Sequence, residues 1–135
     1  MRREVVTPPD VYAPTWQFSQ AVKVTGGSTV YVSGIMGFRP DGTMPDDIVE
    51  QADLVFANLR AVLVAAGGTL DDVVKVTVYV GEDYLAHREE LREVRARYFA
   101  GAAYPASTLV RVAGFADPRY RIEVEAVAVL AVTPP

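Results

Sequence analysis

A pair of glutamates near the carboxyl end of the sequence could do acid–base chemistry. Glu123 and Glu125 lie two residues apart in the segment RIEVEAVAV, so both side chains point to the same side of a predicted strand. Their neighbours are apolar, and a buried carboxylate has to be paired, hydrogen-bonded or protonated. A carboxylate whose protonation is tuned by a cleft can act as a general acid or base. A structural ion pair with Arg111 or Arg121 is an equally good interpretation.

A row of arginines is the second candidate. Arg88, Arg92 and Arg95 share one face of a predicted helix, and glutamates interleave with them. Pairs such as Glu93 with Arg97 have the i, i+4 spacing of solvated salt bridges, each of which contributes only about 0.2–0.5 kcal/mol to helix stability. The pattern therefore favours a solvated helix face over a binding site.

Ser107 is a small polar residue in YPASTLVRV, where a loop enters a predicted strand. It could hydrogen-bond a loop amide after Pro105, as serine often does in turns, or it could belong to a ligand site. Other catalytic patterns find little support. His87 is the only histidine and lies in HREEL on the second predicted helix, which favours a surface histidine.

No metal or cofactor is expected. One histidine, no cysteine and no aspartates or glutamates at the spacing of a metal site leave too few ligands for a transition metal. The glycine pairs at 26 and 67 belong to neither a phosphate-binding loop nor a dinucleotide fingerprint. The remaining function classes are those in which ordinary side chains bind a small molecule or do the chemistry.

The composition predicts one domain, residues 1–135, with little attraction to nucleic acid or to an anionic membrane. The chain has 135 residues, and its 13 basic and 17 acidic side chains give a formal net charge of −4. It has no cysteine, and no apolar segment follows the charges of MRREVVTPPD. We therefore expect a cytoplasmic protein.

The elements that must position these residues follow from hydrophobic periodicity. A helix is predicted from Asp46 to the glycines at 67 and 68, because apolar residues recur there at spacings of three and four. Segments 22–24 and 29–32, separated by Gly-Gly-Ser, predict a hairpin. The remaining predicted elements are a strand at 73–80, a helix at 84–99 and strands at 107–112 and 121–132. The predicted order is ββαβαββ.

This order also predicts how the layers are arranged. A βαβ crossover is right-handed, which places both helices on one face of the sheet. The strands carry apolar residues at both parities, and the run IEVEAVAVLAVTPP reads as a strand that is central in a sheet or lies against another subunit. We therefore expect other copies of the chain to cover the second face.

Several segments together resemble the RidA/YjgF family of reactive-intermediate deaminases. YPASTLVRV followed by IEVEAVAV is similar to the family's carboxy-terminal signature, and FSQAV, VYVSGIMG, QADLVFANLRAVLVAAGGTLDDVVKVTVYV and RARYF agree in order. The resemblance covers about residues 10 to 131. It implies an α+β, chorismate-mutase-like ββαβαββ fold, a mixed sheet with two helices on one face. It also implies a homotrimeric barrel with clefts between subunits.

The resemblance implies roles for individual residues. Members of the family hydrolyse enamines and imines to a ketoacid and ammonia, and an arginine after Pro-Ala binds the substrate carboxylate. Ser107 stands at that arginine position, and a hydroxyl cannot replace a fork of charged donors. Phe18 stands where a tyrosine is common, and Arg92 where an asparagine is frequent. Glu123 matches the glutamate that positions or activates water, and Gly34 of VYVSGIMG matches the substrate-binding segment.

Three functions remain open. The sequence favours a deaminase for an imine, enamine or aromatic amine without the usual small carboxylate, with Phe18, Tyr104 and Trp16 as an apolar wall. The carboxylate could instead be bound by Arg92, or by Arg111, which has the same strand parity as Ser107. The third is a noncatalytic trimer that binds a metabolite or a partner protein. Ribonuclease activity, attached to some relatives, is disfavoured by the acidic composition.

Overall fold

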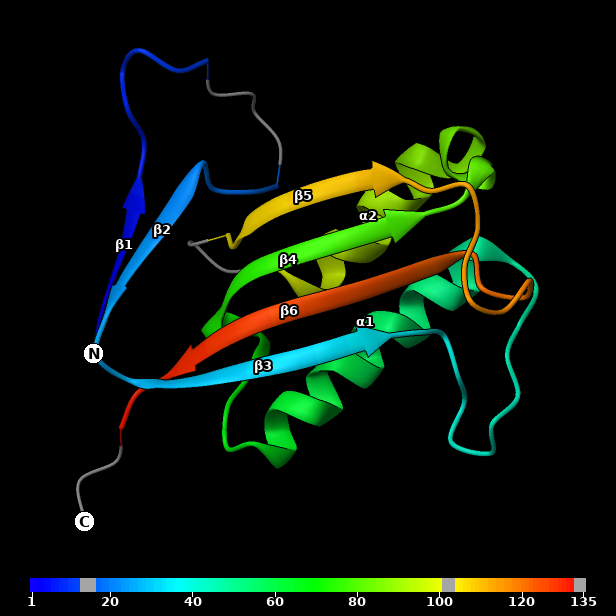
Figure 1. The fold of residues 1–135 in the computed structure, drawn as a ribbon, viewed down its shortest axis with the longest axis horizontal. Helices are drawn as coiled ribbons and strands as arrows, with labels where there is room; N and C mark the ends of the chain where they lie inside the picture. The colour runs from blue at the N-terminus through cyan, green and yellow to red at the C-terminus, as the bar shows by residue number, and fades with distance from the viewer. Residues whose placement is uncertain (13–16, 101–103, 133–135) are drawn as a thin grey trace.

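The fold consists of a mixed four-stranded sheet with two helices on one face, and a separate two-stranded ribbon (Figure 1). The computed structural model describes residues 1–12, 17–100 and 104–132. The sheet has the order β3-β6-β4-β5, which are Ser28–Ile35, Ile122–Leu130, Val73–Val80 and Ala106–Arg111. The helices are α1, Ile48–Ala65, and α2, Arg88–Tyr98, and the ribbon consists of β1, Arg2–Val6, and β2, Ala21–Thr25. Short 3-10 helices, Leu70–Asp72 and Glu82–His87, precede β4 and α2.

The predicted first helix is confirmed, and its ends follow from the capping residues. Asp47 is the N-cap, and its carboxylate accepts a hydrogen bond from the backbone N–H of Glu50 at 3.0 Å. The helix ends before Gly67, which has φ of 92°, a conformation that favours glycine. The apolar face of α1 is buried, with Val55, Leu59 and Leu63 fully inaccessible.

The crossover from β4 through α2 to β5 is also as predicted. β4 and β5 are parallel, with Val76 opposite Ser107 and Val78 opposite Leu109. Both helices lie behind the sheet in the view of Figure 1, on one face. β6 lies between β3 and β4 and is antiparallel to both, which confirms that the carboxy-terminal run is a central strand.

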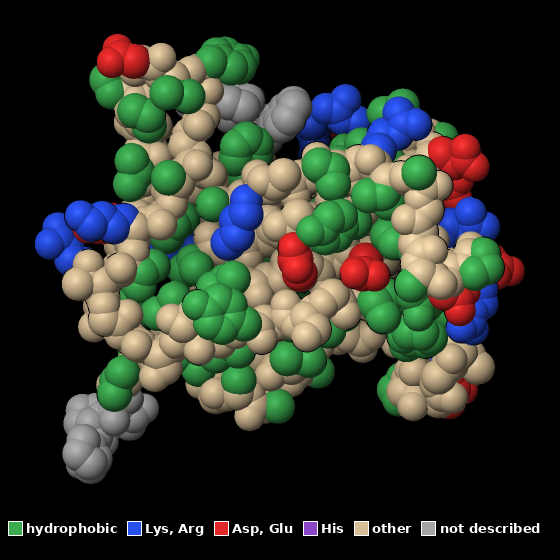
Figure 2. All heavy atoms as spheres, viewed as in Figure 1, with side chains coloured by type: hydrophobic (Ala, Val, Ile, Leu, Met, Phe, Trp, Pro, Cys, Tyr) green, Lys and Arg blue, Asp and Glu red, His purple; other side chains and the backbone are tan. Residues whose placement is uncertain are grey.

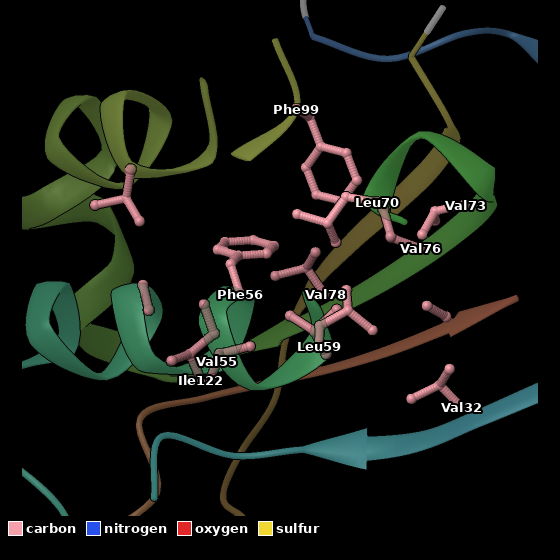
Figure 3. Packing of buried hydrophobic residues seen from close by; sticks show 14 of the residues in the cluster. Val32, Val55, Phe56, Leu59, Leu70, Val73, Val76, Val78, Phe99 and Ile122 are labelled. Atoms are coloured by element: carbon pink, nitrogen blue, oxygen red, sulfur yellow. The ribbon is translucent and has the colours of Figure 1, made fainter. Parts of the chain in front are cut away.

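The hydrophobic core fills the space between the two helices and the sheet (Figure 3). Phe56 of α1 stacks edge-to-face on Phe99, just after α2, with ring centres 5.8 Å apart. Val76 and Val78 of β4 enter this core from the sheet side. In the part of the chain that the structure describes, neither helix is long and apolar enough to cross a membrane.

The amino-terminal hairpin prediction is wrong. β2 pairs with β1, which the sequence pattern does not predict, and β3 pairs with β6. Gly26 and Gly27 both have positive φ, 76° and 87°, and carry the chain from the ribbon into the sheet without closing a hairpin. A side chain at Gly27 would overlap the backbone oxygen of Leu130. The observed order is therefore βββαβαββ.

The face of the sheet away from the helices is mixed in character rather than uniformly apolar (Figure 2). β4 alternates regularly, so its outward side chains are those of Lys75, Thr77 and Tyr79. They lie opposite Val127, Glu125 and Glu123 of β6. Tyr31 of β3, opposite Val127, is 81% exposed. That other copies of the chain cover this face stays a prediction.

Gln51 is a fully buried polar residue of α1 that fixes the start of β6. Its amide nitrogen donates to the carbonyl oxygens of Pro45 at 2.7 Å and Arg119 at 2.9 Å. Its amide oxygen accepts from the backbone N–H of Arg121 at 2.9 Å. These hydrogen bonds hold the loop that leads into β6.

Replacing Gln51 by leucine is expected to lower the free energy of unfolding by about 3 kcal/mol, because three backbone groups lose their partner in a buried place. Urea denaturation of the two proteins measures the difference. Gln20→Leu is the control, since within the described ranges the side chain of Gln20 makes a single hydrogen bond, an exposed one to the carbonyl of Tyr12. Equal losses for the two variants would contradict the structural role of Gln51.

Candidate active site

A cavity of about 470 Å³ lies between α2, the edge strand β5 and the helix-covered face of the sheet. Its floor is apolar and includes Val78 of β4 and Ile122 of β6. Arg88, Arg92 and Arg95 line it from α2. None of the described residues that line it is an aspartate or a glutamate. The cavity is therefore an apolar space with a positively charged wall, the environment that orients an anionic small molecule.

Arg95 extends from α2 to β5 in this cavity. Its Nη1 donates to the hydroxyl of Ser107 at 3.0 Å, and its Nη2 donates to the carbonyl oxygen of Gln17 at 3.3 Å. The guanidinium carbon lies 5.8 Å from the centre of the Phe99 ring. The Nε atom is buried and has no hydrogen-bond partner in the described part of the chain. The two Nη atoms carry four N–H groups, of which these hydrogen bonds use two, so Arg95 keeps donor capacity for a ligand.

Arg95 is a partly buried cation, and its hydrogen-bond partners among the described residues are neutral groups. Within the described ranges, no carboxylate forms an ion pair with it. Burial lowers the pKa of Arg95, because desolvation disfavours the charged form. The guanidinium nevertheless stays protonated at neutral pH. An anion in the cavity would compensate the desolvation through charge-assisted hydrogen bonds.

Arg92 lies one turn before Arg95 on the same wall and is more exposed. Its side chain is 44% accessible, and its ion pair is a 3.7 Å contact with Glu89, whose side chain is 76% accessible. Exposed pairs of this kind contribute about 0–1 kcal/mol. Arg97 pairs with Asp53 of α1 at 3.3 Å rather than with a glutamate of its own helix. The prediction of a solvated helix face is wrong for Arg95, because its guanidinium is bonded to Ser107 and Gln17 in the cavity.

Three of the predicted binding residues meet in the cavity. Phe18, Arg92 and Ser107 all contribute to its lining. The Ser107 hydroxyl accepts its hydrogen bond from the Arg95 guanidinium, so this serine belongs to the cavity. Of the two interpretations of Ser107 from sequence, a hydrogen bond to a loop amide or a place in a ligand site, this contact favours the ligand site.

Two other predicted residues do not line the cavity. Tyr104 packs against the hydrophobic core, and its carbonyl oxygen accepts from the hydroxyl of Ser19 at 2.5 Å. Arg111 is exposed at the end of β5. Trp16 lies outside the described residues. The aromatic lining comes instead from Phe18, Phe56 and Tyr84.

Glu123 and Gly34 lie together on the other face of the sheet. Glu123 is opposite Tyr79, on the face without helices, whereas Ser107 is opposite the buried Val76. A side chain at position 34 would overlap the Glu123 carboxylate, so glycine leaves room for it. Glu123 is half-buried. Within one chain, the glutamate and the arginine wall are therefore separated by the sheet.

Glu125 has a different environment from Glu123. It is exposed and accepts a hydrogen bond from the Tyr79 hydroxyl at 2.7 Å, which raises the pKa of Tyr79. Arg121 pairs with Asp83 at 3.1 Å. Among the described residues, neither glutamate pairs with Arg111 or Arg121, so the predicted structural ion pair is wrong.

Arg95 is the site residue that sequence reasoning placed on a solvated helix face. Its only signal is the helical spacing that it shares with Arg88 and Arg92. His87, at the start of α2, contacts Glu90 at 3.2 Å on the surface. The described part of the chain contains no group of three or more His, Cys, Asp or Glu side chains placed to hold a metal ion.

The sequence matches known proteins over nearly its whole length. A family model described as Endoribonuclease L-PSP matches residues 10–130. The chain is 31% identical over 132 residues to a 2-iminobutanoate/2-iminopropanoate deaminase from Dermatophagoides farinae, covering 95% of this chain and 97% of that protein.

Solved structures show the same likeness. The Rid-family protein YyfB from Yersinia pestis has a TM-score of 0.86 and 32% identity, with 96% of this chain and 100% of the other covered. The Escherichia coli protein TdcF, solved with bound serine, has a TM-score of 0.71 and 32% identity, with 91% and 93% covered.

Proposed function

Because the chain belongs to the RidA/YjgF family, we propose that it is a hydrolytic deaminase of an imine or enamine that carries a carboxylate. The Arg95 guanidinium beside Ser107 carries this proposal. It supplies from α2 the planar fork of donors that the serine on β5 lacks, and this fork matches a carboxylate. Because this guanidinium comes from α2 and not from β5, the site is expected to differ in substrate specificity from relatives that have an arginine on the strand.

Glu123 of a second copy completes the proposed site. Arg95 and Glu123 of one chain lie on opposite faces of the sheet, so a ligand held by one cannot reach the other. In a homotrimer with clefts between subunits, the uncovered face of one copy would approach the cavity of its neighbour. Each cleft would then combine the arginine wall of one chain with the glutamate of another.

The proposed reaction is the addition of water to a carbon–nitrogen double bond. The Glu123 carboxylate accepts a proton from water as the oxygen attacks the imine carbon, and returns the proton to the nitrogen. Transfer of the hydroxyl proton of the carbinolamine to the nitrogen, again through the Glu123 carboxylate, then breaks the carbon–nitrogen bond, forms the ketone and releases ammonia. Arg95 holds the carboxylate next to the reacting carbon and so fixes its distance from the water.

An endoribonuclease, the activity in the description of the matching family model, is a poorer fit. Binding an RNA backbone requires a basic surface that extends over several phosphates. The formal net charge of this chain is −4, and Arg88, Arg92 and Arg95 of α2 line a cavity sized for a small molecule.

Ammonia release from imines generated by an amino-acid oxidase tests the proposal. Arg95→Gln and Glu123→Gln should each be nearly inactive, whereas co-expression of the two variants should restore about a quarter of the sites if each site joins two chains. Failure of the mixture to regain activity would contradict a shared site. No turnover by the unaltered protein of any imine from acidic, aliphatic or aromatic amino acids would contradict the deaminase and favour a binding protein.

A further inference from the structure

The arginine wall carries more positive charge than a substrate with one carboxylate needs. One guanidinium can bind one carboxylate through two parallel hydrogen bonds. Arg92 adds a second guanidinium to the same wall, and no described acidic residue lines the cavity. A ligand whose carboxylate is bound by Arg95 therefore meets a second guanidinium, that of Arg92, in the lining of the same cavity.

Arg92 has the geometry to bind a second acidic group. It is one helical turn from Arg95, and side chains at this spacing have Cβ atoms about 5–6 Å apart on the same face. Its contact with Glu89 is long and exposed, so little energy is lost when the guanidinium turns toward a ligand. Arg95 lies at the buried end of the wall, beside Ser107, and Arg92 lies at the exposed end.

We propose that the substrate is an imino acid with two carboxylates, one held by Arg95 and the second by Arg92. This inference rests on the proposed function for the reaction and adds the class of substrate. The carboxylate next to the imine carbon binds at Arg95, and a short aliphatic chain crosses the apolar floor. The distal carboxylate then reaches Arg92 at the mouth of the cavity.

A matched pair of substrates tests the second carboxylate. The imines of glutamate and norvaline differ only in a terminal carboxylate against a methyl group. The glutamate imine is expected to have a roughly tenfold higher kcat/KM, the ratio expected for one additional charge-assisted contact. Arg92→Gln should lower this ratio about tenfold, whereas Arg97→Gln, on the same helix and paired with Asp53, should preserve it.

Two stable probes separate this inference from the proposed function. Titration calorimetry with 2-oxoglutarate and 2-oxopentanoate measures the same discrimination without turnover, and 2-oxoglutarate should bind roughly tenfold more tightly. Hydrolysis of both imines at equal efficiency, or an unchanged ratio in Arg92→Gln, would overturn the dicarboxylate inference and leave the deaminase intact. Preferential binding of 2-oxoglutarate with no hydrolysis of any imine would support the ligand class and refute the deaminase.

Discussion

Replacing Arg95 by glutamine is expected to lower kcat/KM for imine hydrolysis roughly a hundredfold, because a carboxylate in a buried cavity loses its charged partner, at a cost of about 3 kcal/mol. The fold should survive. Among the described residues, Arg95 donates hydrogen bonds only to the neutral oxygens of Ser107 and Gln17, and a neutral glutamine avoids the desolvation cost that lowers the pKa of Arg95. Ammonia release measures the loss of activity, and thermal denaturation checks the fold.

Two further variants separate the guanidinium from a general effect of position 95. Arg95→Lys keeps the charge without the planar fork and should recover only part of the activity. Ser107→Arg in the Arg95→Gln background returns a guanidinium to the cavity from β5, and should rescue substrates with a single carboxylate. A folded Arg95→Gln protein with kcat/KM within threefold of the original would refute the role of Arg95.

Glu123→Gln is expected to lower kcat by about 10²–10⁴-fold, since glutamine keeps the shape of the side chain and cannot accept the proton of the attacking water. KM should change little, because the carboxylate of the substrate is bound elsewhere. Size-exclusion chromatography should show the same oligomer as the original protein. Retained turnover in this variant would exclude water activation by Glu123.

Glu125→Gln is the matched control for this variant. Glu125 lies on the same strand and the same face as Glu123, but its carboxylate is engaged by the Tyr79 hydroxyl. The substitution should leave kcat unchanged and return the pKa of Tyr79 toward its ordinary value, because the carboxylate that accepts the phenol hydrogen bond raises that pKa. Ultraviolet titration of the tyrosines measures that change independently of activity.

The sequence predicts well the elements whose signals are local. The bounds of β4 follow from its alternation, and the start of α1 lies within two residues of the predicted Asp46, because the signals for both are local. The pairing of β1 with β2 could not be predicted in this way. A glycine pair between two apolar segments indicates that the chain changes direction, but it does not indicate which strand each segment pairs with. β1, with three charged residues in RREVV, has no strong strand pattern of its own.

The residues of the candidate site also fall into a group that the sequence predicts and one residue, Arg95, that it does not. The positions of Ser107, Phe18 and Arg92 in the cavity agree with the resemblance, which compares residues at corresponding places. Arg95 was assigned to a solvated face because helical spacing shows which side chains share a face, and not what that face packs against. Only the packing of α2 beside β5 brings its guanidinium to the serine.

The position of β6 between β3 and β4 also sets the order in which the protein can be assembled on the ribosome. β3 is synthesised early and its partner β6 comes almost at the end, so the sheet stays in two parts while most of the chain emerges. The β4–α2–β5 unit is complete before β6 is synthesised, so its parallel strands can pair while β6 is still missing. A nascent chain that stalls before Ile122 therefore exposes the edges of both β3 and β4, and unpaired edges are where incomplete chains associate with one another.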